Sequence, residues 1–234
     1  MTSLKWFRKG MKNGIPIAAG YFAVSFALGI AAKNVGMDAI QAGYMSLSML
    51  ASAGEFAAIS LIGSAAGILE AILTTIVVNM RYFLMSVSLT QKLSEEVRPL
   101  HRFLLPLFIT DEIFGLSATV EGDLKPAYTY GIALPSVAGW TAGTVLGVIV
   151  GNILPAWAGN ALGVAMYGMF LAIVIPPAKT DHFIGLLVAL SMALSFLCSV
   201  LPYISKIGSG FRIIILTLLL SALAAWIKPR EVEV

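Results

Sequence analysis

Long runs of apolar residues, separated by short polar links, make up most of this chain. A helix that crosses the hydrocarbon core of a bilayer needs about 20 mostly apolar residues. By this measure the sequence predicts seven to eight apolar segments, at about residues 15–32, 39–62, 68–89, 103–120, two within 126–178 that are separated near 152–155, 183–201 and 211–226. We therefore expect an all-α, polytopic transmembrane helical bundle that forms a single membrane domain over residues 1–234.

The distribution of cations leaves two topologies open. Four cations, Lys5, Arg8, Lys9 and Lys12, precede the first apolar segment and favour a cytoplasmic N-terminus. The polar link 91–102 carries three more Lys or Arg residues, but it would lie outside if all three preceding segments crossed the membrane. It lies inside if one early segment is re-entrant or broken. The second segment, which is rich in Ser and Gly, is the natural candidate.

A weak internal repeat relates the two halves of the chain. Residues Pro16–Tyr21 resemble Pro135–Trp140, and a Leu-Gly pair follows at a similar distance in both copies. Such repeats are common in transporters, where the substrate site lies at the repeat interface. The repeat would give halves of 13–120 and 126–228. The alternative is a chance similarity between apolar, Gly-rich helices.

The composition supports the membrane prediction and narrows the function. The chain is 59% hydrophobic and 12% charged, against roughly 25% charged in soluble domains. The net charge of +3 comes from cations that lie mainly in the links, so nucleic-acid binding is not expected. The single cysteine, Cys198, excludes an internal disulfide framework. The sequence has no phosphate-binding P-loop, zinc-protease histidine pair or serine nucleophile elbow. It therefore predicts no enzymatic activity, no metal and no cofactor.

Charged residues within the apolar segments are the candidate functional residues. A charge at the centre of a bilayer costs at least about 2.5–3.5 kcal/mol, so such residues usually pair, face a cavity or carry function. Arg81 lies in the middle of the third segment. Its guanidinium group could bind a substrate carboxylate in a two-point geometry. It could instead form a structural ion pair with Glu55, Asp111 or Glu112.

The acidic candidates have similar alternatives. Glu55 lies in the second segment, where a carboxyl group could carry a proton or act as a fixed partner for Arg81. Asp111 and Glu112 are adjacent and point about 100 degrees apart on a helix. The run Thr110–Glu112 could instead start a helix, where carboxylates satisfy free backbone amides. Close helix packing is expected at small residues, namely Gly54, Gly139, Gly143 and Gly147.

Four motifs occur in an order that resembles one known family. They are Asn13–Pro16 with Gly20 and Gly29, then Ala53–Ala58, Asn79–Met85 and Thr110–Phe114. Together they resemble the AzlC family, the large permease subunit of branched-chain amino acid exporters. The likeness is clearest from residue 10 to about 120. Members of the family often carry Gln where Glu55 stands.

The resemblance implies a secondary active transporter in the cytoplasmic membrane. It implies export of branched-chain or similar amino acids, an ion gradient, and a small AzlD-like membrane subunit as a partner. We expect Arg81, Asn79 and Gly54 to bind substrate or support its site. Glu55, Asp111 and Glu112 are candidates for charge pairing or proton coupling. Alternative functions are a membrane-embedded enzyme acting on lipid, a non-transporting assembly subunit and a passive channel.

Overall fold

The computed structural model describes residues 2–151, 153, 171, 175, 178–202, 204 and 207–228. Their secondary structure is helical, apart from one isolated bridge between Leu93 and Leu124, which agrees with the predicted all-α bundle. The chain divides into two compact units, Met1–Ile59 with Asn79–Met166, and Ser60–Val78 with Tyr167–Val234. We describe each unit by itself.

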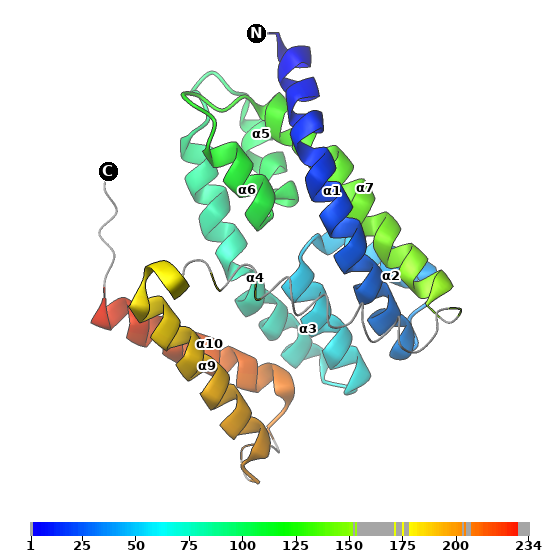
Figure 1. The fold of residues 1–234 in the computed structure, drawn as a ribbon, viewed down its shortest axis with the longest axis vertical. Helices are drawn as coiled ribbons and strands as arrows, with labels where there is room; N and C mark the ends of the chain where they lie inside the picture. The colour runs from blue at the N-terminus through cyan, green and yellow to red at the C-terminus, as the bar shows by residue number, and fades with distance from the viewer. Residues whose placement is uncertain are drawn as a thin grey trace. The chain divides into compact units, whose positions relative to one another are not determined.

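The first unit contains most of the described helices, and Figure 1 labels them in chain order. Their bounds are α1 Ser3–Asn34, α2 Ala39–Met49, α3 Ser52–Gly63, α4 Ile68–Gln91, α5 Pro99–Leu104, the 3-10 helix η1 Leu105–Phe108, α6 Asp111–Ala118 and α7 Pro126–Val150. The last turn of α3 and the first half of α4 belong to the second unit. Among the described residues, α1, α4, α7 and α9 are long and apolar enough to cross a membrane.

Helices α1 and α7 of the first unit pack along each other and run parallel (Figure 1). Gly10 lies against Gly131 near the starts of both helices, and Gly29 lies against Gly147 near their ends. A Cβ atom at either Gly29 or Gly147 would overlap a backbone carbonyl oxygen of the other helix. Glycines therefore allow the two backbones to approach closely along most of their length, as expected for small residues in membrane helices.

The second apolar segment is broken, as its Ser and Gly content predicts. Helix α2 starts with a capping box, in which the Asp38 carboxylate accepts from the backbone amide of Gln41 at 2.8 Å. It ends at Leu50, which adopts a left-handed conformation with φ of 44°. That conformation is costly for a residue with a Cβ atom and cannot continue a right-handed helix. The chain starts again as α3 at Ser52.

The fourth apolar segment, 103–120, is broken as well, and this settles the alternative that the sequence left open there. Pro106 lies in η1, and Ile109 is extended. The segment therefore leaves the helical conformation at Ile109 and does not continue as one regular helix. Helix α6 then starts at Asp111, where the Thr110 hydroxyl accepts from the amide of Ile113 at 3.3 Å. The interpretation of Thr110–Glu112 as a helix start is therefore correct.

Three polar segments meet at one end of the first unit. A pocket there is lined by Ser3 and Trp6 of α1, by residues 96–98 and His101, and by Lys125 and the start of α7. The amide of Leu124 donates to the carbonyl of Lys92 at 2.9 Å, which ties the link after α4 to the link before α7. The N-terminus and the cationic 91–102 link thus lie at the same end of this unit.

The second unit includes α9, His182–Val200, and α10, Ser209–Ile227. Glu70 of α4 lies at the start of α10, where its carboxylate accepts from the amide of Phe211 at 3.4 Å. Arg212 donates to the carbonyl of Cys198 at 3.2 Å. The predicted break near 152–155 and the apolar segment that follows it lie largely outside the described residues. The halves 13–120 and 126–228 stay a prediction.

Candidate functional site

Glu55 lies in the interior of the first unit and is fully buried. It is in the first turn of α3, and its carboxyl group is surrounded by donors from three directions. Ser46 of α2 contacts Oε2 at 2.8 Å, while Trp140 of α7 donates from Nε1 to Oε1 at 2.8 Å. The amide of Ala51, in the break between α2 and α3, also reaches Oε1 at 3.2 Å. Every one of these partners is a neutral group.

A chain of hydroxyl groups continues from Glu55 toward α7. Ser46 Oγ lies 2.7 Å from Thr144 Oγ1, and Thr144 Oγ1 lies 3.2 Å from the carbonyl oxygen of Trp140. Both hydroxyl-bearing residues are fully buried. The carboxyl group of Glu55 is therefore one end of a hydrogen-bonded series that terminates at a backbone acceptor.

An aromatic pair connects this carboxyl group to a second one. The rings of Tyr21 on α1 and Trp140 on α7 meet edge to face, with centroids 5.3 Å apart. The Tyr21 hydroxyl donates to the carboxylate of Glu112 and lies 2.6 Å from the hydroxyl of Thr110. Glu112, like Glu55, lies in the first turn of a short helix that follows a break. Each of the two long central helices thus supplies one aromatic donor to one acidic residue.

Arg81 of α4 forms an ion pair with Asp111 of α6, with Nη1 and Oδ2 2.7 Å apart. Its second guanidinium nitrogen donates to the Tyr82 hydroxyl at 3.1 Å, and the guanidinium group also lies over the Tyr82 ring. The side chains of Arg81 and Asp111 are 41% and 31% exposed. Of the three acidic partners that the sequence left open for Arg81, the structure pairs it with Asp111.

Asn79 and Gly54 are neighbours in space. The amide group of Asn79 occupies the position that a Cβ atom at residue 54 would need, so any larger residue there would displace it. The Oδ1 atom of Asn79 is buried, and it has no hydrogen-bond partner among the described residues. A buried acceptor in this condition is unusual in a folded protein. It marks a position where a bound donor would be stabilised.

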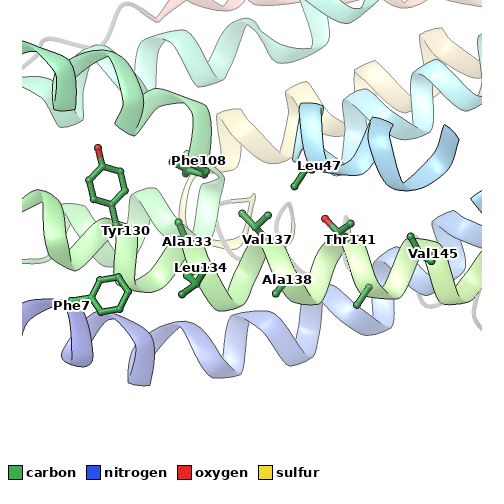
Figure 2. A pocket seen from close by; sticks show the side chains of 11 residues that line it. Phe7, Leu47, Phe108, Tyr130, Ala133, Leu134, Val137, Ala138, Thr141 and Val145 are labelled. Carbon is green, nitrogen blue, oxygen red and sulfur yellow. The ribbon is translucent and has the colours of Figure 1, made fainter. Parts of the chain in front are cut away.

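A groove along α7 is a further concave feature of this unit. It has a volume of about 690 Å³ and is lined by one face of α7 together with Phe7 of α1, Leu47 of α2 and Phe108 of η1. Figure 2 shows that the labelled side chains along it are almost all hydrocarbon, with Tyr130 and Thr141 as the polar exceptions. Because it lacks convergent polar groups, we place the candidate site at the buried polar residues described above.

The structure places all six predicted site residues in the first unit, as linked pairs. Glu55 and Glu112 are connected through the aromatic pair, Arg81 contacts Asp111, and Asn79 contacts Gly54. Sequence reasoning missed the neutral partners Ser46, Thr144, Tyr21 and Trp140. A signal for the last two was present, because Tyr21 and Trp140 end the two copies of the internal repeat. The roles of the six residues stay predictions.

Comparisons with known proteins place the chain in a family. The AzlC protein family matches residues 16–154, which is more than half of the chain. An uncharacterized membrane protein of Archaeoglobus fulgidus is 32% identical over 81% of this chain and 84% of its own length. The inner membrane protein YgaZ of Escherichia coli is 25% identical over 81% of this chain and 80% of its own length.

A third relative carries a functional name. The branched-chain amino acid transport protein AzlC of Bacillus subtilis is 27% identical over 72% of this chain and 66% of its own length. No solved structure matches the chain. The ordered motifs, the apolar helices and the family match agree with one another, and this chain is therefore an all-helical membrane protein that belongs to the AzlC family.

Proposed function

We propose that this chain is a secondary active transporter that exports branched-chain or similar amino acids across the cytoplasmic membrane. The observation that carries the proposal is the cluster of buried and half-buried polar groups between the broken helices of an otherwise apolar bundle. Polar groups at membrane depth are expensive, and they mark substrate or ion pathways. The name of the Bacillus subtilis relative supports amino acids as the solute class. On this proposal the chain performs no covalent chemistry.

The two helix breaks support a transport site at this place. In many secondary transporters the site is formed by discontinuous helices, whose free N-termini face the anionic group of the substrate. Here α3 and α6 both start after a break, and both begin beside the Tyr21–Trp140 pair. The helix starts supply partial positive charge that suits a carboxylate.

The Arg81–Asp111 pair supports a zwitterionic solute. An amino acid presents a carboxylate and an ammonium group, and the two side chains offer the matching opposite charges. We propose that the substrate carboxylate binds the Arg81 guanidinium group in place of Asp111 and that Asp111 then receives the ammonium group. The partial exposure of both side chains leaves them accessible for such an exchange. Asn79, with its unpaired acceptor, supplies a further contact to the ammonium group.

We further propose that the working unit contains a small AzlD-like membrane subunit on a separate chain. The test measures efflux of radiolabelled valine and leucine from cells that express this chain with or without that subunit. Each cell line is also treated with a proton uncoupler. Faster efflux that requires both proteins and is weakened by the uncoupler is the expected result. Unchanged efflux of both amino acids, with both proteins present in the membrane, would overturn the substrate assignment.

The same cells distinguish the alternative functions. A passive channel would give efflux that is insensitive to the uncoupler and shows no acceleration by external unlabelled amino acid. An enzyme acting on lipid would form product in detergent, where no compartments exist. An assembly subunit would keep its effect on the partner after Arg81 is neutralised, whereas a transporter would lose solute movement.

A further inference from the structure

Glu55 is fully buried, and within the part of the chain that the structure describes no cation contacts its carboxyl group. Its hydrogen-bond partners are Ser46, Trp140 and the amide of Ala51, all of which are uncharged. A buried carboxylate with hydrogen bonds but without a counter-charge is costly, and taking up a proton removes that cost. On the basis of the proposed transport function, we propose that Glu55 binds and releases the proton that is coupled to solute movement.

The hydroxyl series beside Glu55 is able to serve both forms of the carboxyl group. In the ionised form, Thr144 donates to Ser46 and Ser46 donates to Oε2, so the two carboxylate oxygens accept three hydrogen bonds. In the protonated form, the new proton on Oε2 is donated to Ser46, Ser46 donates to Thr144, and Thr144 donates to the carbonyl of Trp140. The distances of 2.8, 2.7 and 3.2 Å along this series permit either direction.

The change between the two forms requires only one proton and two hydroxyl rotations. No hydrogen bond to Oε1 is altered, because Trp140 and Ala51 donate to that oxygen in both forms. A buried polar group that loses its partner costs about 1–3 kcal/mol. Since neither form leaves a polar group of this series unpaired, the site is able to hold the proton or release it without breaking the packing around it.

The other charged groups near this site are already engaged. On the α1 side, the Tyr21 ring contacts Trp140 while its hydroxyl contacts Glu112 of α6. On α4, Arg81 pairs with Asp111, and Asn79 is neutral. From α2 and α7 the facing groups are the hydroxyls of Ser46 and Thr144 and the indole of Trp140. The sequence allowed two roles for Glu55, as a fixed partner of Arg81 or as a proton carrier. Arg81 pairs with Asp111 instead, which favours the role of proton carrier.

The first test follows the proton directly in the purified full-length chain. Infrared difference spectra across pH report the carbonyl stretch of a protonated carboxylic acid. We expect a band that disappears as the pH rises in the wild type and is absent in Glu55→Gln, which keeps the size and the hydrogen bonds to Oε1. Ser46→Ala should retain the band at a shifted frequency, because the hydrogen bond that the protonated Oε2 donates to Ser46 is lost.

Two carboxyl-to-amide controls make this test specific. Glu95→Gln changes an exposed residue of the 91–102 link and should leave the band unchanged. Glu112→Gln changes the other acidic residue of the aromatic pair. If Glu112→Gln removes the band and Glu55→Gln does not, the proton belongs to Glu112 and the proposal for Glu55 is overturned. A band that titrates identically in wild type and Glu55→Gln also overturns it.

The second test asks whether the proton is coupled to transport. Proteoliposomes containing the chain and its small partner are assayed for leucine exchange without a gradient and for leucine movement driven by a pH gradient. We expect Glu55→Gln to retain exchange and to lose gradient-driven movement by at least tenfold. Retention of both activities would overturn the coupling. Absence of both in the wild type would refute the proposed substrate instead, while the infrared result on Glu55 would still stand.

Discussion

In the described part of the chain, nearly every buried polar residue has a hydrogen-bond partner. Tyr21 is the best example, because its hydroxyl satisfies both the cap residue Thr110 and the carboxylate of Glu112. At the residue scale, a substitution that removes only one such polar atom is therefore expected to affect stability. Removing the Tyr21 hydroxyl takes one hydrogen bond from the carboxylate of Glu112 and one from Thr110, which still accepts from the amide of Ile113.

We predict that Tyr21→Phe destabilises the protein by about 1–3 kcal/mol, because a hydrogen bond to a half-buried carboxylate is lost. The ring contact with Trp140 is retained, so the loss reports the hydroxyl alone. Unfolding of the detergent-purified protein measures the effect. Tyr44→Phe is the matched control, because Tyr44 is 74% exposed and should change stability little. Equal stability of the two variants would contradict the pairing of Tyr21.

Arg81 is the residue at which we expect transport to be most sensitive. Arg81→Gln should abolish amino acid efflux while the protein still inserts in the membrane. Efflux by the Arg81→Lys variant should also fall by at least tenfold, because an ammonium group does not offer the planar two-point geometry of guanidinium. Efflux assays normalised to membrane protein amount provide the measurement. Arg98→Gln, in the exposed link, is the control, and normal efflux by Arg81→Gln would remove this residue from the site.

At the scale of elements, the spacing of apolar residues predicted the helices well and their interruptions less well. The first and third segments are continuous helices, α1 and α4, as their length implies. The break in the second segment was predicted from its Ser and Gly content. The break in the fourth was one of two alternatives, because Thr110–Glu112 could start a helix while the apolar run 103–120 has the length of a span. Apolar runs identify segments that are covered by lipid or by other parts of the protein. They do not show where the backbone of such a segment turns.

The charged residues of the candidate site could be predicted from the sequence, but their neutral hydrogen-bond partners could not. A charge in an apolar segment is conspicuous because it is expensive, so Glu55, Arg81, Asp111 and Glu112 could be chosen without a structure. Ser46 and Thr144 are ordinary residues for a membrane helix. Their meeting depends on the left-handed turn at Leu50 and on the register of α7. Both are properties of tertiary packing that one sequence does not display.

The glycines between α1 and α7 give a sharp test at this scale. Gly147→Ala places a Cβ atom onto the carbonyl oxygen of Phe26 and should destabilise the protein by about 1–3 kcal/mol through overpacking. Gly20→Ala is the matched control, because nothing lies within 4 Å of its added Cβ atom. Alanine is favoured over glycine in a helix by up to about 1 kcal/mol, so this control should be neutral or stabilising. Thermal unfolding of both purified variants provides the comparison.

At the scale of the whole molecule, the end shared by the N-terminus and the 91–102 link bears on topology. If α1 and α4 each cross the membrane once, the chain returns to its starting side by Gln91 only when α2 and α3 together make no net crossing. The break at Leu50 agrees with such a re-entrant pair. The cations at this end then all lie on one side, which the positive-inside rule assigns to the cytoplasm.

We predict that Thr2 and Glu95 lie on the cytoplasmic side and Asn34 on the opposite side. Single cysteines at these exposed positions, in a Cys198→Ala background, can be treated with a membrane-impermeant thiol reagent. In intact cells Asn34→Cys should react, while Thr2→Cys and Glu95→Cys should react only after permeabilisation. Reaction of Glu95→Cys in intact cells, with Thr2→Cys protected, would show that α2 and α3 together make one net crossing of the membrane.

The glycine contacts between α1 and α7 also decide which parts of this unit are able to move. Two helices whose backbones touch along most of their length cannot slide or tilt against each other without carbonyl oxygens colliding. We therefore expect α1 and α7 to move together as one unit that carries Tyr21 and Trp140. On the proposed transport function, we expect the short helices α2, α3 and α6 to move relative to this pair, with Leu50 and Ile109 as the hinges.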